Sequence, residues 1–253
     1  MISVRHLRRA AATTVLALAG ATTVAPAGAG GYDLAGLWLF NEGSGQVARD
    51  WSFSGNPGRL GSTSTADAND PAWVSLPRVF LLKRAALRFG GDDFARVADA
   101  PSLEPDGVTV VARVRAAASP GDFRYVVAKG ALSCETASYG LYTGDEGGMR
   151  FYVSDGEDFT LSPSASKSSL WDGAWHTVVG AYDGTRVRLW VDGVKVGETL
   201  ADVKIGYGLP DTDDFYVGDY AGPCSQPFGF VGDVDGVALL GSYAPGGSGV
   251  VTQ

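Results

Sequence analysis

The chain has 253 residues, a formal net charge of -8 at pH 7, and 36 glycines against only two cysteines and two histidines. An acidic chain repels the phosphates of nucleic acids and of anionic lipids, so neither nucleic acid nor membrane insertion is expected. A chain of this length can bury a sizeable core without metals or a dense set of disulfides.

The first 29 residues have the three parts of a secretory signal peptide. Arg5, Arg8 and Arg9 make the start basic, the run 10–24 is small and apolar, and Ala27-Gly28-Ala29 fits a cleavage site. A membrane anchor is the alternative, but an apolar run of about 15 residues is shorter than the ~20 that a membrane span needs. We therefore expect a secreted, extracellular protein. Loss of the three arginines, with no acid in the segment, takes the formal charge from -8 to -11.

The remaining sequence predicts short strands separated by glycine-rich turns. We expect strands over 31–40, 79–82, 86–89, 108–114, 123–128, 138–142, 149–154, 159–161, 214–218 and 228–240, with shorter pieces at 47–53, 59–60 and from Val97. The stretch 52–71 is rich in Ser, Gly, Asn, Asp and Thr and is expected to be mainly loop. At most one helical turn is predicted, at 170–174.

The stretch 175–197 carries the clearest strand signal. Asp183-Gly184 and Asp192-Gly193 supply the positive φ angles of tight type I′ hairpin turns. Apolar residues alternate with polar ones around these pairs, which predicts one buried face formed by Val187, Leu189, Val191, Val194 and Val196. Arg188, Trp190 and Lys195 then share the opposite face. We interpret 175–197 as a β-meander with one face buried.

Short strands at intervals of about 8–12 residues predict an all-β fold, a two-sheet antiparallel β-sandwich of the jelly-roll type. One domain is expected over residues 30–245, followed by a flexible tail at 246–253. In an exported chain, Cys134 and Cys224 predict a disulfide bond that closes a loop of about 90 residues. Two unpaired thiols are the alternative.

Four blocks of sequence resemble the laminin G-like (LamG-like) jelly rolls of the concanavalin A-like lectin/glucanase superfamily, particularly those of secreted bacterial proteins. They are GLWLFNEGSGQVARDWSFSGNPGRLG (36–61), LRFGGDDFARVADAPSLEPDGVTVVARVR (87–115), WHTVVGAYDGTRVRLWVDGVKVG (175–197) and FGFVGDVDGVALL (228–240), in family order. The resemblance implies two antiparallel sheets of about six or seven strands each, curved so that one outer face is concave.

The superfamily that these blocks resemble includes glucanases, whose reaction needs two carboxyl groups on opposite sides of a glycosidic bond. Glucanases of this fold carry them in a Glu-x-Asp-x-Glu pattern on one strand. That pattern is absent here, since Glu157 and Asp158 are adjacent and Asp233 and Asp235 share a face without a glutamate. His176, the one histidine after the signal, cannot form a multi-histidine metal site. We therefore expect that the protein is not an enzyme. The alternative is an enzyme that cleaves glycans with a carboxylate pair in an unfamiliar arrangement.

The resemblance also implies a structural calcium ion, Ca2+. Its ligands would be the carboxylate of Asp235, backbone oxygens near Gly91 and a group at Asn41 or Glu42. Two positions depart from the family pattern: Asn41 stands where Asp is common, and Gly236 stands where a glutamate commonly follows. Hydrogen bonding of Asp235 to backbone amides is the alternative.

Carbohydrate binding needs exposed aromatic rings on which sugar rings stack. The candidates are Trp171, Trp190, Tyr220 and Phe228. Trp190 shares its face with Arg188 and Lys195, and it either lines a groove on the concave sheet or packs under a loop. We expect a non-catalytic module that binds extracellular or cell-surface carbohydrate. An adhesion module that binds an extracellular protein is the alternative.

Overall fold

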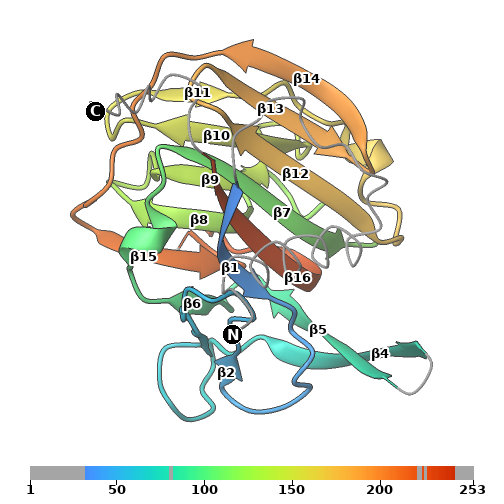
Figure 1. The fold of residues 1–253 in the computed structure, drawn as a ribbon. Helices are drawn as coiled ribbons and strands as arrows, with labels where there is room; N and C mark the ends of the chain where they lie inside the picture. Colours follow the sequence, from blue (N-terminus) through green and yellow to red (C-terminus); the bar gives the residue numbers. More distant parts are fainter. Residues whose placement is uncertain (1–31, 80–81, 221–223, 225–226, 243–253) are drawn as a thin grey trace, which may run out of the picture.

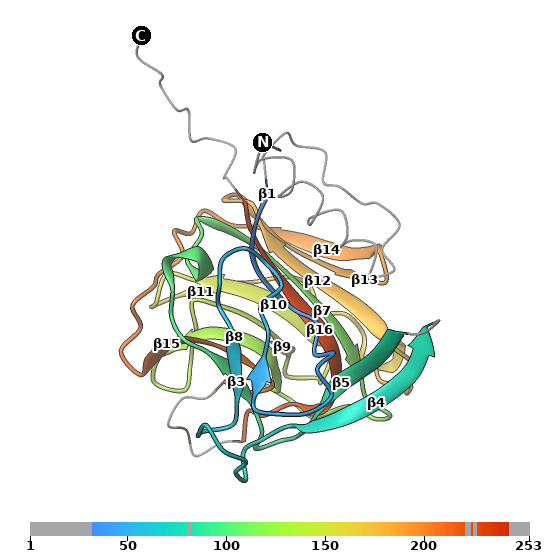
Figure 2. The same ribbon diagram turned by 60° about the horizontal axis from the view of Figure 1, so that its bottom comes forward.

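The computed structural model describes residues 32–79, 82–220, 224 and 227–242, so the predicted signal peptide and the predicted tail lie outside the described residues. Two antiparallel β-sheets are stacked as a sandwich (Figure 1 and Figure 2). The described residues contain two short 3₁₀ turns, η1 (Pro101–Leu103) and η2 (Lys167–Ser169). The second turn lies three residues before the one predicted. No helix in this part of the chain is long and apolar enough to cross a membrane.

Sheet A contains, in spatial order, β14 (Val194–Leu200), β13 (Arg186–Val191), β12 (His176–Tyr182), β7 (Gly107–Arg115), β16 (Val231–Ser242), β5 (Leu82–Gly90) and β4 (Ala72–Val79), and β1 (Tyr32–Trp38) also pairs with β16. Sheet B contains β11 (Phe159–Leu161), β10 (Met149–Ser154), β9 (Tyr139–Thr143), β8 (Tyr125–Ala131), β15 (Thr212–Val217), β6 (Ala95–Val97), β3 (Gly58–Leu60) and β2 (Val47–Ala48). Each sheet has eight strands among the described residues, more than the six or seven expected.

The core lies between the sheets and follows the period-two pattern of the strands. In β7, the side chains of Val108, Val110, Ala112 and Val114 are all 0% exposed, while the residues between them face away from the core. Trp38 of β1 stacks on Phe215 of β15 across the sandwich, with ring centroids 5.1 Å apart. Burial of one aliphatic side chain, such as Val110, contributes about 1.5–3 kcal/mol to the stability of the fold. The alternation therefore fixes which face of each strand is internal.

The meander of β12, β13 and β14 is confirmed, but Val194, predicted on its buried face, is 71% exposed after an irregularity in the pairing of β13 with β14. The two turns also differ. Asp192 and Gly193 both have positive φ angles, 49° and 78°, as a two-residue type I′ turn requires. At the other turn only Gly184 is left-handed, with φ of 89°. The Asp183 carboxylate there accepts hydrogen bonds from the backbone N–H groups of Thr185 and Arg186, at 3.0 and 2.9 Å. A loop capped by the Asp183 side chain therefore replaces the expected type I′ turn.

The hairpin of β4 and β5 corrects one predicted strand. Val79 and Leu82 were expected in one strand over 79–82, but they pair with each other across the hairpin. β4 lies at the edge of sheet A, where Pro77 is tolerated because its missing N–H is not needed by a second neighbour. The two strands extend away from the sandwich at the lower right of Figure 1.

Candidate functional site: an aromatic cluster on the outer face of sheet B

A row of cross-strand neighbours crosses the outer face of sheet B. From β11 to β2 it consists of Leu161, Tyr152, Gly140, Ala128, Tyr216, Arg96, Arg59 and Val47. Small residues occupy its middle, where aromatic rings lie over the sheet. A Cβ atom on Gly140 would come within 2.8 Å of the Tyr152 ring and 3.1 Å of the Tyr125 ring. Glycine at this position therefore allows both rings to approach the β9 backbone closely.

Seven rings, here called the aromatic cluster, meet over this part of the sheet: Phe123, Tyr125, Tyr142, Tyr152, Phe159, Tyr220 and Phe228. Tyr125 is central, with ring centroids 5.1 Å from both Tyr142 and Tyr220 and 6.0 Å from Phe228. Aromatic pairs at such distances contribute about 0.5–1.5 kcal/mol beyond the burial of their area. The cluster is a small second core on the outside of the sandwich.

The hydroxyls of Tyr125, Tyr152 and Tyr220 in the aromatic cluster are hydrogen-bonded. The hydroxyls of Tyr152 and Tyr125 lie 3.2 Å apart, and Tyr152 also accepts the N–H of Ala137 at 3.0 Å. Tyr220 donates to the carbonyl of Thr136 at 2.5 Å. Burial raises the pKa of the Tyr142 and Tyr220 hydroxyls to about 12. These two groups therefore stay neutral near pH 7, and hydrogen bonds as well as packing fix the Tyr220 ring.

Phe123 and Phe159 form the exposed margin of the aromatic cluster. They are 46% and 51% exposed, whereas Tyr125, Tyr142, Tyr152 and Tyr220 are at most 7% exposed. Phe123 stacks on Tyr142 with centroids 6.5 Å apart and 21° between the ring planes, and Tyr142 stacks on Tyr125 at 22°. Three nearly parallel rings thus lead from solvent into the face of the sheet.

The backbone at Phe123 is strained. Its φ angle is 55°, in the left-handed region that large side chains rarely adopt, and its N–H donates to the Thr143 carbonyl at 3.0 Å. Such a conformation costs about 1–3 kcal/mol and persists where the surrounding structure enforces it, commonly at binding and active sites. The fold therefore holds a half-exposed ring on Tyr142 at some expense of stability.

Polar groups surround the Phe123–Tyr142 stack. Arg150, the cross-strand partner of Tyr142, lies 3.7 Å from the carboxylate of Asp145, whose side chain is 69% exposed. The Nε atoms of Arg150 and Arg124 are buried and have no hydrogen-bond acceptor among the described residues. An unpaired buried donor is costly and is usually satisfied by water or a ligand. An aromatic ring with adjacent carboxylate and guanidinium groups suits a ring-shaped, hydroxyl-rich ligand.

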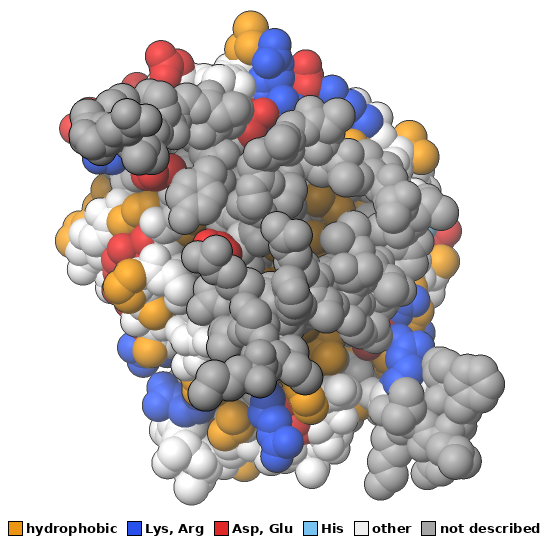
Figure 3. Space-filling view, in the orientation of Figure 1, with side chains coloured by type: hydrophobic (Ala, Val, Ile, Leu, Met, Phe, Trp, Pro, Cys, Tyr) orange, Lys and Arg blue, Asp and Glu red, His pale blue; other side chains and the backbone are white. Residues whose placement is uncertain are grey.

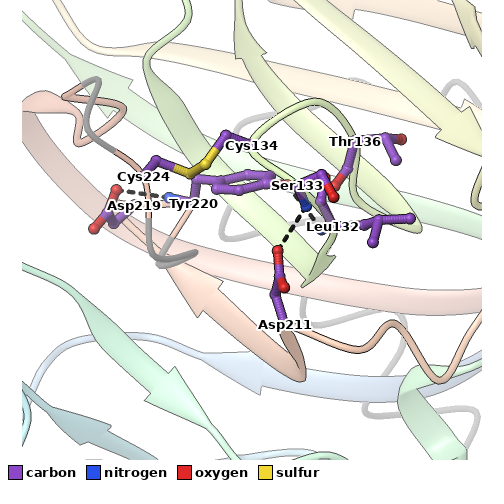
Figure 4. The surroundings of a disulfide bond; sticks show 8 residues. All are labelled: Leu132, Ser133, Cys134, Thr136, Asp211, Asp219, Tyr220 and Cys224. Carbon is purple, nitrogen blue, oxygen red and sulfur yellow. Dashed lines mark hydrogen bonds between the residues drawn. A yellow bond between two sulfur atoms is a disulfide. The ribbon is translucent and has the colours of Figure 1, made fainter.

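The predicted disulfide bond between Cys134 and Cys224 is confirmed, with Cα atoms 5.6 Å apart. It joins the turn after β8 to the segment after β15, and the Tyr220 ring lies beside it (Figure 4). Ser133 and Cys134 both have left-handed φ angles, 55° and 61°, and the Ser133 N–H donates to Asp211 at 2.6 Å. The disulfide therefore anchors one border of the aromatic cluster.

The structure separates the predicted ligand-binding residues. Tyr220 and Phe228 belong to the aromatic cluster, with Tyr220 only 1% exposed. Trp171 is a core residue, 6% exposed, whose indole N–H donates to the Gly147 carbonyl, so it presents no ring face to a ligand. Trp190 and Arg188 lie on the outer face of sheet A, because Val187 and Leu189 between them fill the core. Arg188 there pairs with Asp183 and Glu198.

Five members of the aromatic cluster were not predicted as site residues: Phe123, Tyr125, Tyr142, Tyr152 and Phe159. The signal for Phe123 is its place directly after Gly121-Asp122, where a turn leaves a large ring with little to cover it. Tyr142 gives no such signal, because its place in the strand sequence is compatible with either face of the sheet. Its neighbours Tyr125 and Phe123 come from another part of the chain.

Asp235 has neighbours that differ from the calcium ligands implied by the resemblance. Its carboxylate is paired with the guanidinium groups of Arg84, at 2.5 Å, and Arg113. Asn41 is exposed, and the Gly91 carbonyl faces Gly229, where any Cβ would clash with it. Two cations already neutralise Asp235, so the residues at this position do not fit a calcium ion.

A different group of carboxylates converges within 4.8 Å in the described part of the chain: Asp99, Glu104 and Asp213. The distances suit a cation, and a cation is present. Lys129 is 0% exposed, and its Nζ lies 3.0 Å from Asp99, 3.4 Å from Glu104 and 2.9 Å from Asp213. Burial raises the pKa of Glu104, with a hydrogen bond to Asp213 adding to the effect. A divalent ion would have to displace the Lys129 ammonium.

His176 forms hydrogen bonds to two neighbouring turns. Its Nδ1 lies 2.7 Å from Asp192 and its Nε2 lies 3.1 Å from Asp172. Elsewhere on the surface, both signs of charge are present: Figure 3 shows Lys and Arg side chains interspersed with Asp and Glu on one face of the described residues. Neither the surroundings of His176 nor this mixed distribution of charge identifies a nucleophile beside a base.

The comparison with protein families identifies the class. The family model Laminin_G_3, concanavalin A-like lectin/glucanases superfamily, matches residues 89–243. The chain therefore belongs to this superfamily, as the four sequence blocks indicate. No curated protein sequence matches the chain significantly.

Solved structures share the fold at low identity. Domain 4 of AbnA, a GH43 extracellular arabinanase from Geobacillus stearothermophilus solved with arabinotriose, is 14% identical with a TM-score of 0.56, over 85% of this chain and 95% of that one. The binding domain of botulinum neurotoxin serotype D/C is 9% identical with a TM-score of 0.53, over 83% and 47%. Trypanosoma rangeli sialidase is 19% identical with a TM-score of 0.50, over 81% and 30%. This chain covers less than half the length of the neurotoxin structure and of the sialidase structure.

Proposed function

We propose that this protein is a secreted, non-catalytic module that binds carbohydrate through the aromatic cluster on sheet B. The observation that carries the proposal is the Phe123 ring, which is 46% exposed, is stacked on Tyr142 and is held by a left-handed backbone. Sugar rings stack their C–H faces on such a platform, while their hydroxyls pair with polar groups at its margin. The arabinanase domain of the same fold, solved with arabinotriose, supports a sugar as the ligand.

Binding without hydrolysis is the second part of the proposal. A glycosidase holds one carboxyl group on each side of the bond to be cleaved, about 5–9.5 Å apart. Beside the Phe123–Tyr142 stack, Asp145 is largely exposed and is paired with Arg150. We therefore assign Asp145 and Arg150 to hydrogen bonding of sugar hydroxyls.

The proposed binding does not depend on calcium. The carboxylates of Asp99, Glu104 and Asp213 surround Lys129, and Asp235 is paired with Arg84 and Arg113. Cations of the chain itself thus pair with the carboxylates in both of these places. The proposed extracellular location rests on the signal-peptide pattern of residues 1–29 and is supported by the disulfide between Cys134 and Cys224.

A glycan array tests this function. The purified protein is applied with calcium and with chelator, next to Phe123→Ala, and the bound glycans are then incubated with the protein and assayed for new reducing ends. We expect neutral oligosaccharides to be bound equally in both buffers, binding to be lost in Phe123→Ala, and no reducing ends to form. If no glycan binds while a purified extracellular protein does, the adhesion alternative replaces the proposal. Reducing ends that disappear with one acid-to-amide substitution would establish an enzyme.

A further inference from the structure

Two aspartates of β16 are each held between two arginines from the neighbouring strands. Asp233 accepts hydrogen bonds from Arg88 of β5, at 2.7 and 3.2 Å, and from Arg115 of β7, at 3.1 and 2.5 Å. Asp235 is held in the same way by Arg84 of β5 and Arg113 of β7. The register explains this arrangement, because Asp233 is the cross-strand partner of both Arg88 and Arg115.

These six side chains lie on the outer face of sheet A. Val234, between the two aspartates, is 0% exposed in the core, as are Ala112 and Val114, which alternate with Arg113 and Arg115. Period-two alternation therefore directs the charged side chains away from the core. This face is opposite the one that carries the aromatic cluster, so the two surfaces can act independently.

The charges of this group do not cancel. Four guanidinium groups surround two carboxylates, which leaves a formal excess of two positive charges. The aspartate side chains are 6% exposed, whereas Arg84, Arg88, Arg113 and Arg115 are 33%, 57%, 27% and 29% exposed. The carboxylates are thus covered, and the accessible surface is formed by guanidinium groups.

A purely structural ion pair needs one arginine for each aspartate. The second arginine on each carboxylate adds uncompensated charge, which repels its neighbour and contributes little to stability. Each guanidinium also has five N–H donors, and the described bonds to Asp233 or Asp235 use one or two on each arginine. The remaining donors belong to partly exposed side chains on the outer face of sheet A, where they can bind carboxylate or sulfate groups.

Trp175 completes this surface. The Cζ atoms of Arg113 and Arg115 lie 4.8 and 4.6 Å from the centre of its indole ring. The ring is partly exposed, next to the start of β12. Cation–π contacts hold both guanidinium groups against the ring and fix their planes. An apolar ring edge thus adjoins an array of anion-binding donors.

We propose that the arginine surface, defined as Arg84, Arg88, Arg113, Arg115 and Trp175, binds an acidic polysaccharide. Carboxylates or sulfates of the sugar chain pair with the outward N–H groups, and a sugar ring packs against Trp175. The ligand is a polysaccharide because the positive surface is small and the rest of the chain is acidic, with a net charge of -8. Duplex DNA carries one charge per ~1.7 Å, so its phosphates would extend far beyond this surface onto repelling carboxylates.

Binding to immobilised polygalacturonate tests the proposal, with its methyl ester as the uncharged control of identical backbone. The test variant is Arg84→Gln/Arg88→Gln, which leaves Asp235 with Arg113 and Asp233 with Arg115 and removes only the excess charge. The matched control is Arg186→Gln/Lys195→Gln, which removes two exposed cations elsewhere on sheet A. Thermal unfolding checks that each variant is folded, and the exposed single change Arg88→Gln is used if the double variant is not.

We expect wild-type protein to bind polygalacturonate and not its methyl ester, with affinity that falls as salt is raised. Arg84→Gln/Arg88→Gln should lose about tenfold or more, as expected for loss of charged hydrogen bonds, and Arg186→Gln/Lys195→Gln should stay within about twofold. Phe123→Ala should bind polygalacturonate normally, which separates this surface from the aromatic cluster. Absence of binding, equal loss in both double variants, or tighter binding of duplex DNA or phosphatidylserine vesicles in the same buffer would overturn the proposal.

Discussion

The ammonium group of Lys129 lies 2.9 Å from the carboxylate of Asp213, and the Lys129 side chain has no exposed surface. Asp99 and Glu104 complete its surroundings, so one buried lysine connects β8 to the loop around η1 and to β15. The Tyr207 ring lies 5.4 Å from the same ammonium. Burial of a charged ammonium group is costly, and here three neighbouring carboxylates offset that cost.

Replacement of Lys129 by methionine should destabilise the fold strongly at neutral pH. Three carboxylates would be left close together without a cation, and loss of one partner from a buried ion pair costs about 3–5 kcal/mol. The cost should shrink as pH falls, because protonation removes the repulsion, and the raised pKa of Glu104 makes it an early group to protonate. Urea unfolding at about pH 7 and about pH 5 measures both effects. Lys195→Met, at an exposed ion pair, should cost at most about 1 kcal/mol.

Calcium should stabilise the Lys129→Met variant and leave the wild-type protein unchanged. In the wild type, the ammonium holds the position between Asp99, Glu104 and Asp213, so adding calcium or chelator should not move the unfolding temperature. In the variant, three carboxylates within 4.8 Å are available to an ion. Differential scanning calorimetry with calcium, with magnesium and with chelator compares the two proteins. A wild-type unfolding temperature that drops in chelator would show that the native fold contains a calcium ion.

His176 should make stability depend on pH. Burial alone would lower its pKa, but the hydrogen bonds and charges of Asp192 and Asp172 outweigh burial, so the pKa is raised. A raised pKa means that the charged form stabilises the fold. That contribution is fully present below the unfolded-state pKa of about 6.5 and is lost as pH rises through the folded-state pKa.

The advantage of wild type over His176→Gln should therefore be larger at about pH 5.5 than at about pH 9. Because the two aspartates are about half exposed, the difference should be no more than about 1 kcal/mol. Urea unfolding of both proteins at the two pH values provides the measurement. A free-energy difference that is the same at both pH values would contradict the assignment of the charged histidine.

A methyl group at Gly140 should disturb the aromatic cluster. Its Cβ would lie 2.8 Å from the Tyr152 ring, so Gly140→Ala forces the ring to move and should cost about 1–3 kcal/mol. Gly58→Ala is the matched control in the same sheet, because its nearest contacts are at 3.4 and 3.5 Å. Chemical unfolding measures the cost, and near-ultraviolet circular dichroism reports on the tyrosine environment. Equal costs at the two glycines would mean that the rings do not pack over β9.

The β-sandwich could be predicted from the sequence because its signals are local. Alternation in 107–115 and 175–197, and left-handed turns such as Asp192-Gly193, identify strands and hairpins without knowledge of the partner strand. Cys134 and Cys224 could also be paired, since the described chain holds no other cysteine. β4 gave no clear signal because Pro77 interrupts it, and only its edge position makes that residue acceptable.

The site could not be predicted because its contacts are between distant segments. The alternation around Trp190 shows that it faces outward, but not which sheet it belongs to or what accompanies it there. Tyr125 meets Tyr220 because β8 pairs with β15, and Asp235 meets Arg84 across 151 residues of sequence. A carboxylate in a strand is equally consistent with calcium and with arginine until its neighbours are known. Strand order, which is not encoded in local patterns, decides between them.

In the proposed function, Phe123 is the platform for a sugar. Titration calorimetry with the strongest-bound neutral oligosaccharide tests it most directly, on wild type, Phe123→Ala and the control Phe53→Ala, whose ring is 63% exposed on another loop. We predict that Phe123→Ala weakens binding at least about tenfold, as loss of a stacked ring contributing ~1.4 kcal/mol or more would, and that Phe53→Ala binds like wild type. If folded Phe123→Ala binds the sugar with wild-type affinity, or if both variants lose affinity equally, Phe123 is not the platform.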